Sequence, residues 1–112
     1  MDFYYEFQKK PFSKRCELSN QIKLKYNRCS IILDRYSKTD PLIPKHKFII
    51  DPNLPCFEFL FQIRKLLKIN AYQAIYLFHR NEVMNMTRRI CDYGSSPDGF
   101  IYFFYSIENT FG

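Results

Sequence analysis

The spacing of apolar residues switches along this chain between the period of a helix and the alternation of a strand, and the order of these switches restricts the fold. After Pro11 a set of apolar residues recurs at helical spacing with bases on the opposite face: Phe12, Cys16, Ile22 and Tyr26. The pattern predicts an amphipathic helix over residues 11–25. The aromatic segment 3–7 is expected to add another turn or two of helix before it.

Two segments that follow alternate as strands do. Residues 29–36 place Cys29, Ile31 and Leu33 on one face. After a polar, proline-bearing loop, residues 45–50 are predicted to form a second strand. In that strand Phe48 and Ile50 share one face, and Lys47 and Ile49 share the other.

Residues 56–67 carry the clearest helical pattern of the chain. Its predicted core-facing stripe is Cys56, Leu60, Ile63 and Leu67, which leaves Phe57, Phe59 and Phe61 on the flanks. Residues 74–78 and 100–105 are predicted to be strands. The polar region 80–97 between them is predicted to be irregular, with a possible short helix near residues 87–91.

This order of elements, over 112 residues, predicts one α+β domain with a single main core. No apolar run approaches the length needed to span a bilayer, and the amino terminus does not resemble a secretion signal, so a cytosolic location is expected. Four well-separated cysteines without a C-x-x-C pair indicate reduced structural thiols: Cys16, Cys29, Cys56 and Cys91.

Catalysis finds little support in the sequence. The two histidines, His46 and His79, have no plausible nucleophile or metal ligands beside them, and there is no glycine-rich phosphate loop. We therefore predict that the protein is not an enzyme and uses no metal or cofactor.

Basic residues outnumber acidic ones by 17 to 11 and gather in the first quarter of the chain. Such a segment can be a solvated helix face or can attract nucleic acid, an anionic membrane or an acidic peptide. An RNA-binding sheet is disfavoured, because strand 100–105 has no base and no internal glycine. Peptide binding fits better, since strand 45–50 carries bases and an outward Ile49 and could accept an added strand.

Several blocks, in this order, resemble the autophagy ubiquitin-like modifiers of the Atg-eight and GABARAP type over essentially the whole chain. They are residues 11–15, 22–28, 45–50, 59–65 and 98–112, and the last block is the most specific. The chain departs from the usual family pattern at some positions, with Ser30 in place of a proline and Leu18 where an acid is common.

The resemblance implies a ubiquitin-like β-grasp fold with two additional amino-terminal helices. Residues 1–26 would be the helical extension, 27–107 the β-grasp core and 108–112 a conjugation tail. It also implies that Gly112 is activated by an ATP-dependent enzyme, passed as a thioester to a conjugating enzyme and joined to phosphatidylethanolamine. Phe111 would be recognised by those enzymes. A cysteine protease would remove any tail beyond Gly112 and later release the lipid. If Gly112 is the natural end, maturation would be unnecessary, and a processed chain would end in the same way.

In this family the anchored protein recruits receptors through an acidic-aromatic motif added as a strand. The matching positions around the aromatic-residue pocket are Ile22, Ile32, Lys47, Ile49 and Phe100. Those around the aliphatic-residue pocket are Phe48, Ile50, Leu54 and Phe59. Arg28, Lys45 and Lys47 would attract the acidic flank of the motif. A lipid-anchored pool on autophagosomal or related membranes is implied, without nucleic acid as a partner. A noncovalent peptide-binding adaptor and a protein-conjugated modifier are the alternatives.

Overall fold

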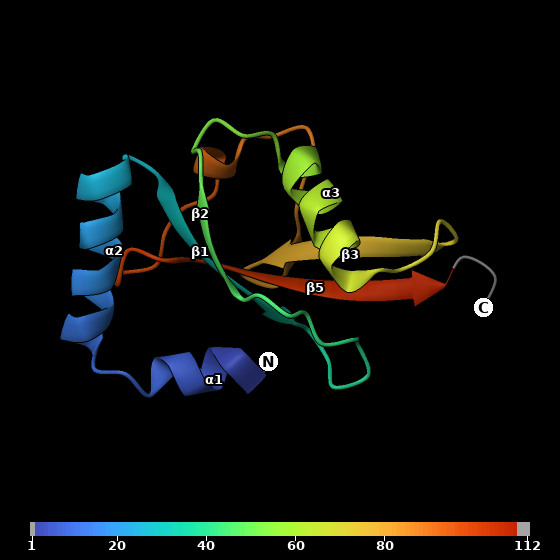
Figure 1. The fold of residues 1–112 in the computed structure, drawn as a ribbon, viewed down its shortest axis with the longest axis horizontal. Helices are drawn as coiled ribbons and strands as arrows, with labels where there is room; N and C mark the ends of the chain where they lie inside the picture. Colours follow the sequence, from blue (N-terminus) through green and yellow to red (C-terminus); the bar gives the residue numbers. More distant parts are fainter. Residues whose placement is uncertain (1, 110–112) are drawn as a thin grey trace.

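Five strands form one mixed sheet in the order β2-β1-β5-β3-β4, and the computed structural model describes this sheet and its helices over residues 2–109 (Figure 1). In chain order the elements are α1 (Asp2–Gln8), α2 (Phe12–Tyr26), β1 (Cys29–Arg35), β2 (Lys47–Ile50), α3 (Cys56–Leu67), β3 (Gln73–His79), β4 (Glu82–Val83), the 3₁₀ helix η1 (Ile90–Asp92) and β5 (Ile101–Asn109). This is the ubiquitin-like α+β fold that was predicted, with two helices added before it.

The two central strands, β1 and β5, run parallel, with Ile31 opposite Ile101. The remaining neighbours pair antiparallel. Five consecutive residues of β1 are buried, because α3 covers one face of the sheet and α1 and α2 pack against the other (Figure 1). β1 is therefore buried on both faces, including its polar residues Ser30 and Asp34.

The face of α3 that meets the sheet differs from the predicted stripe. Phe59, expected on a flank, is fully buried together with Cys56 and Ile63, whereas Leu60 and Leu67 are only partly buried at the edge of the core. The ring of Phe59 packs edge-on against Phe48, 5.2 Å between centroids, so α3 turns its largest core side chain toward β2. Phe57 and Phe61 remain exposed, as their flanking positions suggested.

Two boundaries also differ from the sequence prediction. Region 80–97 contains the short strand β4, which pairs with the end of β3 through a turn in which Arg80 and Asn81 have positive φ angles of 52° and 66°. β5 continues to Asn109 and stays paired with β3, so the sheet extends into the segment expected to be tail. The short helix expected near residues 87–91 is the 3₁₀ turn η1.

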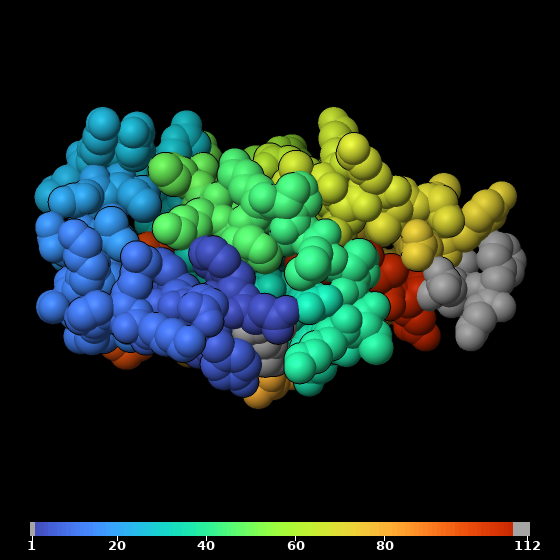
Figure 2. Space-filling model, turned by 60° about the horizontal axis from the view of Figure 1, so that its bottom comes forward, coloured from blue at the N-terminus to red at the C-terminus, as the bar shows by residue number. Residues whose placement is uncertain are grey.

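α1 is held on the sheet by contacts to β1 and to the loop after it. The backbone N–H of Tyr4 donates to the carboxylate of Asp34 at 2.9 Å, and the Phe3 ring stacks on His46 with centroids 4.4 Å apart. The space-filling view shows α1 lying against the segment that follows β1 (Figure 2). None of the described helices is long and apolar enough to cross a membrane.

Candidate functional site

β2 is an edge strand whose outward face carries the residues proposed for peptide binding. It pairs with β1 on one side only, so the backbone groups of its other side have no strand partner among residues 2–109. Phe48 and Ile50 are buried while Lys47 and Ile49 are exposed, which confirms the predicted alternation.

A cavity of about 340 Å³ opens beside this strand, between β2 and α2, and we call it the β2 cavity. Its lining is apolar except for two lysines: Leu18, Ile22, Ile31, Lys45, Lys47, Phe48, Ile49 and Phe100. Its volume lies in the range of pockets that hold small ligands or a large side chain. The structure thus brings Ile22, Lys47, Ile49 and Phe100 together, as expected for an aromatic-residue pocket.

Three positions around the β2 cavity differ from the sequence expectation. Ile32 is buried below the cavity, in a small cluster with Phe7 and Phe100, and does not line it. Leu18 and Ile31 line it without having been predicted to do so. Leu18 lies one helical turn before Ile22, so the spacing of α2 contained the signal that could have found it.

Two ammonium groups flank the β2 cavity. Lys45 Nζ lies 4.8 Å from the centroid of the Phe48 ring, and Lys47 Nζ lies 5.5 Å from that of Phe7. Both side chains are exposed, and neither has an ion pair with a carboxylate in the described part of the chain. An apolar hollow beside a free strand edge, with two available cations, suits an extended ligand that carries a large apolar side chain and acidic neighbours.

The residues expected to form the aliphatic-residue pocket belong to the main core. Phe48, Ile50 and Phe59 are buried there, and the partly buried Leu54 packs against them. They lie together, on the α3 side of β2, but their side chains are largely covered. Their role in contacting a ligand stays a prediction.

Arg28 does not join the two lysines. It is exposed and lies just before the end of β1 at which Cys29 pairs with Ile50, and it lines a different cavity at the end of the sheet. Its expected part, with Lys45 and Lys47, in attracting the acidic flank of a bound motif stays a prediction.

Phe111 and Gly112 lie outside the described residues. The strand that leads to them, β5, runs through the centre of the sheet and ends far from α2 along the long axis of the molecule, which measures 45 Å (Figure 1). Chemistry on the tail and ligand binding beside β2 would therefore take place in separate regions.

The cysteine and histidine side chains of residues 2–109 differ from one another in chemistry and environment. Burial raises the pKa of the Cys56 thiol to about 11 and also raises that of Cys29, so both are protonated and weakly nucleophilic at neutral pH. Burial lowers the pKa of His79, which contacts the Gly94 carbonyl at 3.0 Å. The described residues contain no group of three or more His, Cys, Asp or Glu that could hold a metal ion.

Known proteins share both the sequence pattern and the fold. Residues 14–112 match the family model described as "Autophagy protein Atg8 ubiquitin like". Autophagy-related protein 8c of Arabidopsis thaliana is 36% identical over 107 residues, which cover 91% of this chain and 90% of that protein. Autophagy-related protein 8 of Dictyostelium discoideum is 35% identical over 108 residues, covering 91% and 88% of the two chains. The crystal structure of Trypanosoma brucei ATG8 superposes with a TM-score of 0.83 at 24% identity, over 94% of this chain and 95% of that one.

Proposed function

The chain belongs to the Atg8 family of ubiquitin-like autophagy proteins, and from this premise we propose that it is a modifier joined through Gly112 to phosphatidylethanolamine. Once on the membrane, it would recruit receptors that carry an acidic-aromatic motif. In this proposal the domain comprises a helical extension over residues 1–26, a β-grasp core that runs from residue 27 to the end of β5 at Asn109, and a conjugation tail over 110–112.

The proposed conjugation uses the carboxyl group of Gly112. An activating enzyme would use ATP to activate the carboxylate, a conjugating enzyme would carry it as a thioester, and the lipid amine would displace the thiol to form an amide. A glycine suits the narrow clefts of such enzymes because it has no Cβ, and Phe111 would be the side chain that they recognise. A cysteine protease would later hydrolyse the amide.

The amide would anchor by two acyl chains a protein whose helices within residues 2–109 are not long and apolar enough to cross a membrane. Each buried CH₂ contributes about 0.8 kcal/mol, and two chains hold a protein far more firmly than one. The protein would then exist as a cytoplasmic pool and a lipid-anchored pool on autophagosomal or related membranes.

The observation that best supports receptor binding is the β2 cavity, with Lys45 and Lys47 beside the free edge of β2. A receptor segment would pair its backbone with β2, insert its aromatic side chain between α2 and β2, and place its acidic residues near the two ammonium groups. Burial of that side chain would contribute roughly 1.5–3 kcal/mol before ordering costs, which is consistent with micromolar affinity for the whole motif.

Reconstitution tests the conjugation. The chain would be incubated with activating enzyme, conjugating enzyme, ATP and liposomes containing phosphatidylethanolamine, beside a Gly112→Ala variant. The parent should gain the mass of one lipid in an ATP-dependent manner and the variant should not. No lipid on the parent, or equal lipid on both, would refute the conjugation.

Receptor binding has its own test. Titration calorimetry with an acidic-aromatic peptide should give weaker binding to the Lys47→Glu, Ile49→Ala double variant than to the parent. Lys25→Glu is the matched control. It makes the same change of charge as Lys47→Glu, but Lys25 lies on α2 and does not line the β2 cavity. Equal affinity of the double variant and the parent would remove this surface from the proposal.

A further inference from the structure

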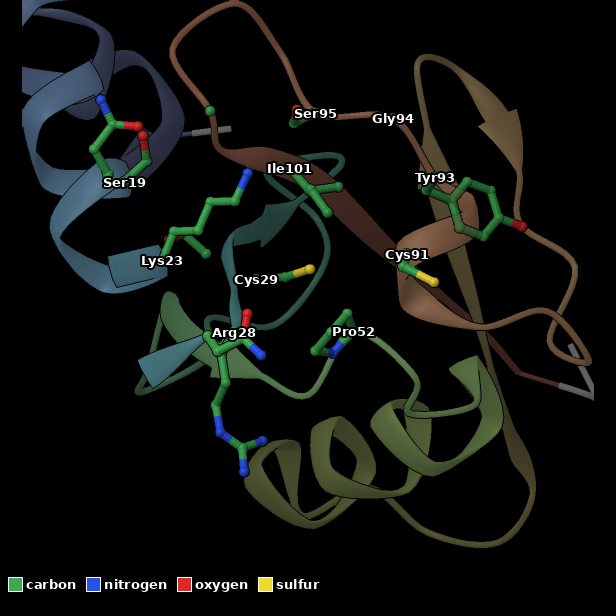
Figure 3. A pocket seen from close by; sticks show the side chains of 14 residues that line it. Ser19, Lys23, Arg28, Cys29, Pro52, Cys91, Tyr93, Gly94, Ser95 and Ile101 are labelled. Atoms are coloured by element: carbon green, nitrogen blue, oxygen red, sulfur yellow. The ribbon is translucent and has the colours of Figure 1, made fainter. Parts of the chain in front are cut away.

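A second cavity, of about 370 Å³, opens where α2 ends and β1 begins, and we call it the sheet-end cavity (Figure 3). Its walls come from α2, the start of β1, the turn after β2, η1 and the segment before β5. It is distinct from the β2 cavity, because Leu18 and Ile22 of α2 line that one whereas Ser19 and Lys23 line this one. Its volume lies in the range of small-molecule sites.

The sheet-end cavity is positively charged. Lys23 extends its ammonium group into it (Figure 3), and within residues 2–109 that group has neither an ion pair nor a hydrogen bond. Arg28 adds a second charge at the rim, although its guanidinium group points away from Lys23. The lining contains no aspartate or glutamate, so nothing on the cavity wall neutralises these charges.

The wall also carries a serine hydroxyl group that is available for hydrogen bonding. Ser30 is 4% exposed and lines the cavity, yet its side chain makes no hydrogen bond to any described residue. The Ser30 oxygen is accessible from the cavity, so its hydroxyl group can donate to a bound ligand. The side-chain amides of Asn20 and Asn27 also line the cavity and can donate.

The rest of the wall is compatible with an anion and with an organic group attached to it. Burial, followed by the influence of Cys91 and Asp51, raises the pKa of Cys29, so its thiol is neutral at physiological pH and does not repel an anion. Pro52 and Ile101 supply apolar surface next to the polar groups.

We propose that the sheet-end cavity binds the phosphate group of a small organic phosphate ester or of a phospholipid headgroup. Lys23 supplies the counter-charge, and Ser30 and the two asparagines donate hydrogen bonds. Because these donors come from both α2 and β1, they approach from more than one side, which suits a tetrahedral oxyanion better than a flat carboxylate. This site does not depend on conjugation of Gly112 or on the β2 cavity.

The experiment uses ¹⁵N-labelled protein titrated at constant ionic strength with inorganic phosphate and with glycerol phosphate. The backbone signals of Ser30, Gly94 and Gly99 should shift and saturate. Lys23→Gln should weaken binding by about tenfold or more, because a charge-assisted contact is lost. Ser30→Ala should weaken it a few-fold. Lys25→Gln is the matched control and should keep the parental affinity, since Lys25 Nζ lies over the Tyr26 ring, 5.2 Å from its centroid, and does not line the cavity.

A second measurement uses the unmodified chain. Cys91 is exposed and lines the same cavity, so bound phosphate should slow its alkylation by a neutral maleimide, and this protection should be absent from Lys23→Gln. Vesicles with and without a phosphoinositide distinguish a phospholipid headgroup from a soluble phosphate ester as the ligand. Binding of vesicles that requires Lys23 indicates a headgroup, and binding of glycerol phosphate alone indicates a soluble ester. Absence of saturable shifts, or equal weakening by Lys23→Gln and Lys25→Gln, would overturn the proposal.

Discussion

Ser19 and Gly99 meet where α2 contacts the segment before β5, with no room between them for another carbon atom. The Ser19 hydroxyl donates to the Asp98 carbonyl at 2.6 Å, and a Cβ placed on Gly99 would lie 2.9 Å from the Cβ of Ser19 and closer still to its oxygen. Gly99 also has a backbone φ angle of +88°, which residues other than glycine rarely adopt. This contact helps to join the amino-terminal helices to the β-grasp core.

Gly99→Ala should therefore lower the free energy of unfolding by about 2 kcal/mol or more, through backbone strain and overpacking together. Urea unfolding followed by circular dichroism measures the change. Gly94→Ala is the matched control, because its added Cβ would meet the Arg80 guanidinium at an ordinary 3.5 Å. Equal stability of the two variants would show that the Ser19 contact relaxes without cost.

The ion pair between Arg15 and Asp98 fixes the same junction. Arg15 Nε lies 3.0 Å from the Asp98 carboxylate, which is almost fully buried and also accepts from the Phe100 N–H and the Tyr102 hydroxyl. Asp98→Ala should cost about 3 kcal/mol, because a largely buried guanidinium group loses its counter-charge. Lys9→Ala breaks an exposed pair with Glu6 and should leave the unfolding midpoint nearly unchanged. A similar small effect for Asp98→Ala would mean that water replaces the carboxylate.

Strand alternation carried the most reliable structural information in the sequence. Lys47 to Ile50 has one buried and one exposed face, so its polarity pattern fixed which side chains point outward. The buried face of α3 was harder to predict. Phe59 and Leu60 are both apolar, and either could follow Cys56 on a helical stripe. Phe59 is the buried one because it packs against residues of the sheet. These residues are distant in sequence, so the local pattern around Phe59 does not reveal them.

The missed features depend on contacts between distant segments. β4 has two residues, too few for any alternation, and exists because the Arg80–Asn81 turn folds the chain back onto β3. Ile31 is fully buried in the main core, and its place in a predicted strand does not indicate that it also borders the β2 cavity. The family resemblance indicated most of that cavity in advance, and the role that it implies for Arg28 stays a prediction.

Buried tyrosines should make the fold sensitive to alkaline pH. Burial raises the pKa of Tyr105 above its ordinary value of 10.0, and its hydroxyl donates to the Pro41 carbonyl. Below pH 10 both the folded and unfolded chains keep this proton. Above pH 10 the unfolded chain loses it first, so stability should fall as pH rises. Tyr105→Phe should make the decline between pH 10 and the folded-state pKa shallower, as measured by urea unfolding at stepped pH values. An unchanged slope would exclude Tyr105 as a contributor.

Phe7 should support the β2 cavity from behind. Its ring is 2% exposed, lies 4.9 Å from the ring of Phe100 and has Lys47 Nζ at 5.5 Å, and both of these partners line the cavity. Phe7→Ala should speed amide exchange in α1 and weaken an acidic-aromatic peptide about three- to tenfold, because Phe100 and Lys47 lose the ring that positions them. Tyr5→Ala, on the exposed side of the same helix, should change neither quantity much. If α1 exchanges freely in Phe7→Ala while the peptide keeps its parental affinity, α1 does not position the cavity. If both change together, bound peptide must in turn slow exchange in α1 of the parent, since coupling between two sites is reciprocal.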